Sequence, residues 1–233
     1  MKYMGSKNRI AKHILPIMLK EMEEKGHTTW VEPFVGGGNM IDKVPDKYER
    51  IGCDLNEHTI AAMLGIRDFV NVLPEQVSEE TYKAVKGTSA HPINSWIRYA
   101  CSFSGKFDNG YARDKTNRNY AKEQKNSALK QSSKIQGVEF IFCSYEDLSG
   151  VTNSIIYCDP PYQGTTGYKT GAFNHEEFFQ WCRDMKSKGN SVFVSEYNAP
   201  NDFELVWEGE VKTNFSSTRK TATHNAVEKL FKV

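Results

Sequence analysis

An apolar run over residues 154–158 ends directly at Asp159-Pro160-Pro161-Tyr162, and this junction constrains the fold more than any other part of the chain. The run is typical of a buried strand, and open α/β sheets place their ligand chemistry at the carboxyl ends of such strands. Two consecutive prolines fix φ and restrict the residues before them, so the backbone after the strand is stiff and non-helical. This stiff segment, residues 159–162, is called the shelf below. It presents a carboxylate and a phenol to a planar ligand. An ordinary loop exit is the alternative interpretation.

Strand-like and helix-like stretches alternate along the rest of the chain. Apolar, β-branched runs predict strands, and apolar residues at helical spacing predict helices. We expect helices over residues 8–25 (kinked at Pro16), 56–69 and 175–188, strands over 28–34, 50–55, 139–145, 155–158 and 191–196, and antiparallel edge strands over 203–212 and 228–233. This order predicts the α/β class, with a doubly wound sheet covered by helices on both faces.

A basic and mostly helical stretch interrupts the alternation. Residues 98–134 contain nine Lys and Arg against three Asp and Glu, a net charge of +6, whereas the whole chain has a net charge of +1. A basic block in an otherwise acidic chain is typical of a polyanion-binding surface, and a solvated, charged helix face is the alternative. We take residues 60–135 to be an inserted lobe in a domain formed by residues 1–59 and 136–233.

Cysteine and histidine usage argues against several classes of site. The five cysteines form no C-x-x-C pair and the six histidines form no i, i+4 pair, so neither a zinc site nor a redox motif is indicated. An odd number of scattered thiols fits a reducing cytoplasm. No apolar run approaches the ~20 residues that span a bilayer, and the first residues lack the apolar core of a signal peptide. We therefore expect a soluble, cytoplasmic protein with neither a metal nor a membrane as partner.

Three consecutive glycines, Gly36, Gly37 and Gly38, follow the first predicted strand within the segment 32–39. Glycines let a backbone approach a ligand closely, but neither a phosphate loop nor the full G-x-G-x-x-G spacing is present. Asp54 ends the second predicted strand 18 residues after Gly36, where nucleoside-binding α/β folds place an acid that accepts hydrogen bonds from ribose hydroxyls. Initiation of the next helix is the alternative role. A glycine turn with this acid implies a ligand that has a ribose but no pyrophosphate, and S-adenosylmethionine answers that description.

The motifs together resemble a known family. They are Tyr3-Met4-Gly5-Ser6-Lys7, Glu32-Pro33-Phe34-Val35-Gly36-Gly37-Gly38, Asp54-Leu55-Asn56 and Asp159-Pro160-Pro161-Tyr162. Their order and spacing resemble those of the Dam-type DNA adenine-N6 methyltransferases, which are often encoded by phages or paired with restriction systems. The resemblance covers nearly the whole length and is weakest over residues 70–135. It implies a Rossmann-like, S-adenosylmethionine-dependent methyltransferase sheet with a helical DNA-recognition insertion, in the cytoplasm of a bacterium or of a phage-infected host.

The resemblance also implies a set of cofactor contacts. An N-terminal aromatic–x–Gly–x–Lys segment binds the methyl donor in those enzymes, and Tyr3 replaces its usual tryptophan here. Ser144-Tyr145 matches the position that flanks the adenine of the cofactor. The implied cofactor-binding residues are Tyr3, Lys7, Glu32, Pro33, Phe34, Gly36, Gly38, Asn39, Asp54, Tyr145 and Asp159.

Catalysis is expected on the proline shelf, with a flipped adenine as the planar ligand, because its amine cannot be reached inside the base stack. Asp159 and a carbonyl of Pro160 or Pro161 can accept both amine hydrogens and localise the nitrogen lone pair. Tyr162 stacks on the base. Ser195-Glu196-Tyr197-Asn198, at the end of another predicted strand, is a further candidate lining of this pocket.

Double-stranded DNA is the partner that the resemblance implies for the basic block. Gly110-Tyr111-Ala112-Arg113 loosely matches the Asn-Gly-x-x-Arg loop of the family. The predicted DNA-binding residues are Arg98, Lys106, Arg113, Lys115 and Arg118. Two alternatives stay open: methylation of cytosine N4, RNA or a protein amide, which Asp159 disfavours by resemblance, and a catalytically silent DNA-binding relative.

Overall fold

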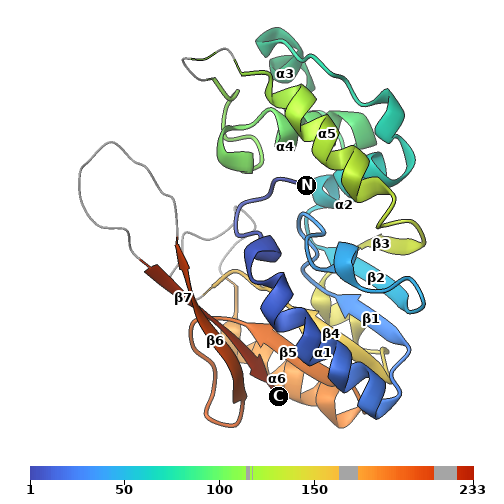
Figure 1. The fold of residues 1–233 in the computed structure, drawn as a ribbon, viewed down its shortest axis with the longest axis vertical. Helices are drawn as coiled ribbons and strands as arrows, with labels where there is room; N and C mark the ends of the chain where they lie inside the picture. Colours follow the sequence, from blue (N-terminus) through green and yellow to red (C-terminus); the bar gives the residue numbers. More distant parts are fainter. Residues whose placement is uncertain (114–115, 117, 163–172, 213–224) are drawn as a thin grey trace. The chain divides into compact units, whose positions relative to one another are not determined.

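The computed structural model describes residues 1–113, 116, 118–162, 173–212 and 225–233 (Figure 1). The chain forms two compact units, each built from two segments. The first unit contains Met1–Asn8 and Phe34–Tyr145, and the second contains Arg9–Pro33 and Glu146–Val233.

The second unit contains five strands, β1 (Thr29–Glu32), β4 (Ser154–Cys158), β5 (Ser191–Ser195), β6 (Glu204–Lys212) and β7 (Asn225–Lys232). They lie in the order β1-β4-β5-β7-β6. The first three are parallel, and β7 is antiparallel to both β5 and β6. All residues of β4 and β5 are buried, as expected for strands covered on both faces.

Two helices cover these strands, α1 (Ala11–Lys25) and α6 (His175–Ser187). Helix α1 packs on β4 and β5, α6 packs on β5, and the two helices lie on opposite faces of the strands (Figure 1). Asn174 caps α6, because its side-chain oxygen accepts from the backbone N–H of Glu176 and Glu177 at 3.2 and 3.3 Å. The second unit is therefore an α/β layer structure whose parallel strands end at the predicted shelf.

The first unit combines a parallel strand pair with helices. Strands β2 (Glu49–Asp54) and β3 (Val138–Phe142) pair so that Asp54 lies opposite Phe142. The Asn56 side chain caps the next helix by accepting from the His58 N–H at 3.0 Å. The helices are α2 (Glu57–Asp68), α3 (Glu79–Val85), α4 (Pro92–Ala100) and α5 (Tyr120–Ser132), and α2 packs on both α4 and α5.

Short 3-10 turns connect these elements. They are η1 (Lys7–Arg9), η2 (Ile41–Lys43), η3 (Val70–Val72), η4 (Phe103–Gly105) and η5 (Tyr145–Leu148).

The predicted α/β class is confirmed, and each helix expected outside the inserted lobe is present within three residues of its expected ends. The tail differs in one respect: β6 is at an edge, whereas β7 is internal because it pairs with both β5 and β6. The compact first unit joins residues 60–135 to β2 and β3, so the lobe boundary stays a prediction. No helix in the described part of the chain is long and apolar enough to cross a membrane.

Candidate active site

The glycine turn and the N-terminal motif meet in the first unit. Gly36 and Gly38 have φ values of +49° and +64°, a region that glycine adopts without strain. A Cβ added to Gly36 would lie 2.9 Å from Cε1 of Tyr3, and one added to Gly37 would lie 2.7 Å from Cβ of Tyr3. The predicted Tyr3 thus lies directly on the turn, and larger residues at these glycines would displace its ring.

Other predicted cofactor residues have contacts within the N-terminal segment or to it. The Tyr3 ring packs against Tyr99 with centroids 5.7 Å apart. Lys7 is buried, and its Nζ donates to the carbonyl of Gly5 at 3.3 Å. The Asn39 amide donates to the carbonyl of Met1 at 3.1 Å. Segments far apart in sequence therefore build one polar and aromatic rim around the turn.

Asp54 ties the end of β2 to this turn. Its Oδ2 accepts from the backbone N–H of Gly36 at 3.0 Å, and its Oδ1 accepts from the N–H of Asn56 at 2.9 Å. Burial raises the pKa of this carboxyl to about 6, against these two hydrogen bonds and one with the Thr59 side chain, which lower it. A carboxylate has about four acceptor positions, so Asp54 can hold the turn and still accept from a ligand hydroxyl.

Apolar rings lie beside Asp54. Phe142 lies opposite Asp54 in the strand pair, and Leu55 follows Asp54 in the chain; both side chains are 55% exposed. The rings of Phe34 and Tyr145 are 5.7 Å apart. Exposed apolar side chains next to a carboxylate suit the flat face and the sugar of a nucleoside. Sequence reasoning missed Phe142, although its position at the end of the strand that pairs with β2 was a usable signal.

Gln131, on α5, donates hydrogen bonds to the glycine turn. The sequence analysis did not predict this residue. It is 4% exposed, and its Nε2 lies 3.0 and 3.1 Å from the carbonyl oxygens of Gly37 and Gly38 and 3.2 Å from Oδ2 of Asp42. A buried amide with these partners fixes the backbone of the turn. A glutamine in a polar helix carries no sequence signal for this contact.

The shelf at the end of β4 lies in the second unit. Asp159 is half-buried and Pro160 is buried. The Tyr162 hydroxyl donates to Oε2 of Glu228 on β7 at 2.7 Å, and its ring meets that of Tyr197 edge-on, with centroids 4.6 Å apart. Burial, followed by the charges of Asp159 and Glu228, raises the pKa of Tyr162 well above 10, so the phenol is a donor at neutral pH.

A histidine supports the middle of the shelf. Nε2 of His175, the first residue of α6, lies 3.1 Å from the carbonyl oxygen of Pro161 and 3.6 Å from Oε2 of Glu196. Glu196 is 1% exposed. The strand end at Ser195–Asn198, a further candidate in the sequence, thus brings Glu196 near this histidine and Tyr197 against Tyr162.

Glu32, predicted at the cofactor, is 2% exposed and accepts from the Trp30 indole N–H at 2.9 Å. Pro33, the next residue, is also buried. Both lie in the second unit, whereas Phe34 begins a segment of the first unit.

Arg98 differs from the other predicted DNA contacts because it is only 4% exposed. Its Nε and Nη2 donate to the two carboxylate oxygens of Asp108 at 3.0 and 2.6 Å, and Nη1 donates to the Thr88 carbonyl at 3.0 Å. Its guanidinium also lies 4.3 Å from the centre of the Phe107 ring. In this conformation Arg98 fixes the loop that follows α4.

The remaining basic candidates are exposed where they are described. Lys106 and Arg113 are on the surface, and Arg113 pairs with Glu79. Arg118 is also exposed and pairs with Glu123 at 2.6 Å. Lys115 lies outside the described residues.

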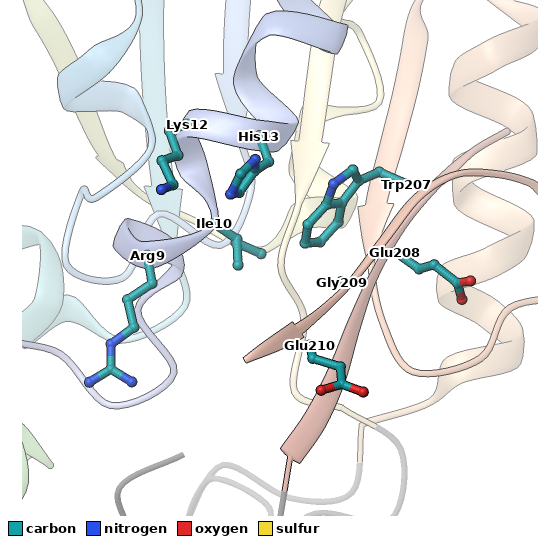
Figure 2. Close-up of a pocket in the computed structure, with 8 residues that line it drawn as sticks. All are labelled: Arg9, Ile10, Lys12, His13, Trp207, Glu208, Gly209 and Glu210. Atoms are coloured by element: carbon teal, nitrogen blue, oxygen red, sulfur yellow. The ribbon is translucent and has the colours of Figure 1, made fainter. Parts of the chain in front are cut away.

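The second unit also contains a hollow of about 450 Å³, drawn in Figure 2. The rings of His13 and Trp207 point toward each other across it and stack, 5.9 Å apart with planes at 13°. Its lining has both signs of charge and contains none of the predicted site residues. The lining residues are Arg9, Ile10, Lys12, His13, Trp207, Glu208, Gly209 and Glu210.

Among the residues that the structure describes, no group of three or more His, Cys, Asp and Glu side chains is arranged to hold an ion.

Comparison with known proteins gives two curated relatives. The chain is 23% identical to the type II methyltransferase M.MjaIII of Methanocaldococcus jannaschii, a match that covers 90% of this chain and 87% of that protein. It is 24% identical to the modification methylase StsI of Streptococcus sanguinis, over 91% of this chain but 36% of that protein. The rRNA methyltransferase aviRa of Streptomyces viridochromogenes aligns with a TM-score of 0.49 at 12% identity, over 100% of this chain and 86% of that one.

A family model matches most of the chain. The D12 class N6 adenine-specific DNA methyltransferase model aligns with residues 3–90 and 97–224. These ranges contain the Tyr3 motif, the glycine turn, Asp54 and the shelf, so the predicted family is confirmed. The chain therefore belongs to the D12 class of N6 adenine-specific DNA methyltransferases.

Proposed function

We propose that the substrate is a specific adenine in duplex DNA, and that this base is flipped out of the helix onto the shelf of Asp159, Pro160, Pro161 and Tyr162. The observation that carries the proposal is the geometry of the shelf: a half-buried carboxylate and an anchored tyrosine ring at the carboxyl end of a fully buried strand. A flipped base needs hydrogen-bond acceptors at its edge and a ring at its face. The shelf supplies both.

The glycine turn fits S-adenosylmethionine. A Cβ on Gly36 or Gly37 would fill the space that Tyr3 borders, and Asp54 retains acceptor capacity for ribose hydroxyls. When bound, the donor supplies an electrophilic methyl group. We assign Tyr3, Lys7, Gly36, Gly38 and Asn39 to the rim of its site, together with Phe34, Asp54 and Tyr145.

The shelf makes the adenine amine nucleophilic. This amine is a weak nucleophile because its lone pair is delocalised into the ring. Acceptance of one hydrogen by Asp159 and of the other by a backbone carbonyl localises the pair on nitrogen. Because the Pro161 carbonyl already lies within hydrogen-bond distance of His175, we assign the second acceptor to the carbonyl of Pro160.

The basic block provides the DNA contacts in this proposal. Exposed Lys106, Arg113 and Arg118 can exchange their present solvent or carboxylate partners for phosphates, and Lys115 is added from the sequence alone. Arg98 is assigned to the support of the loop between α4 and Ala112, because a buried guanidinium with a bidentate partner is not available to a phosphate.

Transfer of a labelled methyl group tests the shelf. Asp159→Ala should lower methyl transfer to duplex DNA by ~10²–10³, because it removes a preorganised acceptor, while Asp202→Ala, on an exposed turn, should leave the rate unchanged. Unchanged thermal unfolding in both variants controls for folding. An Asp159→Ala enzyme with the wild-type rate, or preferential labelling of RNA or protein by the wild type, would contradict the proposal.

A further inference from the structure

The bond between Tyr162 and Glu228 joins two parts of the second unit that are 66 residues apart. The tyrosine follows β4 on an irregular segment, whereas Glu228 lies within β7. Strand β7 is paired on both sides, since Glu228 lies opposite Gly209 of β6 and Leu230 lies opposite Ser195 of β5. Glu228 thus lies on a strand that pairs with β6 at Glu228 itself and with β5 from Leu230 onward, and the Tyr162 hydroxyl is bonded to its carboxylate at 2.7 Å.

Two contacts restrict the Tyr162 ring. Its hydroxyl is tied to Glu228, and its ring meets Tyr197 at an interplanar angle of 83°. A tyrosine has two side-chain torsions, and one contact at its tip and another at its body restrict both. The ring is therefore held in one orientation before any base arrives, which lowers the entropic cost of binding.

The protonation state of the phenol makes the hydrogen bond between Tyr162 and Glu228 a strong one. The phenol stays protonated at neutral pH because burial and nearby carboxylates raise the pKa of Tyr162 well above 10. A neutral hydroxyl that donates to a carboxylate forms a charge-assisted hydrogen bond, which is shorter and stronger than a neutral one. The hydroxyl is thus an anchor of the ring, and Glu228 is the acceptor.

We propose that Glu228 is a positioning residue for methyl transfer, which orients the ring of Tyr162 toward the target adenine and acts on the reaction only through that ring. This inference rests on the proposed role of Tyr162 as the stacking platform. It adds to the shelf a residue of β7 that no motif contains.

A double-mutant cycle tests the inference. Methyl transfer to duplex DNA is measured for the wild type, Tyr162→Phe, Glu228→Ala and the double variant. Loss of a hydrogen bond to a charged group should lower kcat/KM for DNA on the order of tenfold in Glu228→Ala. The double variant should be no slower than Tyr162→Phe, because the anchor is already absent without the hydroxyl.

Controls separate positioning from folding. Glu208→Ala removes an exposed carboxylate from the neighbouring strand β6 and should leave the rate unchanged. Glu228→Gln keeps the side-chain size and a neutral acceptor, so it should fold and lose less activity than Glu228→Ala. A DNA duplex with 2-aminopurine at the target position should show weaker capture of the flipped base in Glu228→Ala, at unchanged donor Kd.

The outcomes distinguish this inference from the function on which it rests. A Tyr162→Ala enzyme with wild-type activity would remove the stacking platform itself. If Tyr162→Ala is impaired but Glu228→Ala is not, or if the losses of Glu228→Ala and Tyr162→Phe multiply in the double variant, Glu228 does not act through the tyrosine and the inference is overturned.

Discussion

Asp54, at the end of β2, combines a structural role with a proposed role in ligand binding. Its carboxylate accepts from the backbone N–H groups of Gly36 and Asn56, which ties the glycine turn to the cap of α2. These bonds and one with the Thr59 side chain partly offset the desolvation that raises its pKa to about 6. In the proposed site its remaining acceptor capacity serves the ribose hydroxyls, so the proposal predicts donor binding that depends on pH.

Donor affinity should fall as the pH is lowered through about 6. Ribose hydroxyls donate to the ionised carboxylate, so protonation of Asp54, with its pKa raised to about 6, removes an acceptor and weakens binding by at most tenfold per pH unit. Calorimetric donor Kd values between pH 5 and 8 would show this slope. Asp54→Asn should bind weakly with no slope in this range, and an equal slope in that variant would assign the titration to another group.

At the scale of elements, the helices of the first unit support motifs that lie elsewhere in the sequence. Helix α5 contributes Gln131 to the glycine turn, and α4 contributes Arg98 to the loop that follows it. That loop closes as a hairpin: Ser102 and Tyr111 form a bridge, and the Ala112 N–H donates to the Cys101 carbonyl at 2.8 Å. Helices of the predicted recognition lobe thus have structural roles within the first unit.

Gln131→Ala should weaken donor binding about tenfold, because the variant lacks the hydrogen bonds that hold two carbonyls of the glycine turn. Gln131→Glu should also weaken donor binding, since a carboxylate cannot donate to those carbonyls and lies beside Asp42, although it still accepts from the Met1 amine. Asn126→Ala, on the exposed side of the same helix, is the matched control for donor Kd. Equal donor affinity in all three variants would show that the glycine turn keeps its conformation without the hydrogen bonds from Gln131.

Arg98→Ala should destabilise the fold by about 3 kcal/mol, the usual cost of a buried ion pair that loses one partner. Urea unfolding measures this free energy. Lys106→Ala, on the exposed part of the same loop, should change it little. If Arg98→Ala is as stable as the wild type but no longer binds DNA, Arg98 is a DNA contact after all.

At the scale of the whole molecule, the chain distributes its motifs over two compact units. The Tyr3 motif, the glycine turn, Asp54 and the basic block belong to the first, and the proline shelf belongs to the second. In the proposed function, the residues assigned to the donor and to DNA thus lie mainly in the first unit, and the residues assigned to the target base lie in the second. The basic block, residues 98–134, carries a net charge of +6, whereas the rest of the chain carries a net −5.

DNA affinity should depend steeply on salt, and the basic block should set the slope. Replacement of Arg113, Lys115 and Arg118 by Gln should reduce the slope of log K against log salt by roughly 0.9 for each phosphate that the variant no longer neutralises. Lys20→Gln, an exposed lysine on α1, is the control. An unchanged slope in the triple variant would assign phosphate binding to other cations, such as Arg9 and Lys12.

The class of fold, the family and the main motifs were predictable because their signals are local. Asn56 and Asn174 cap helices through their own neighbours. A mostly apolar pentapeptide predicts a buried strand, glycines permit positive φ, and prolines restrict their own backbone. Such effects act within a few residues, so they can be recognised without the fold.

The tertiary structure alone decided which side chains support the site. Glu228 reaches Tyr162 across 66 residues, Gln131 reaches the glycine turn across 94, and burial turns Arg98 from a predicted DNA contact into a bidentate partner of Asp108. None of these residues differs locally from an ordinary polar residue on a strand or helix. Their roles depend on the packing of strands and helices, which determines the surroundings of each polar group and the partners that satisfy it.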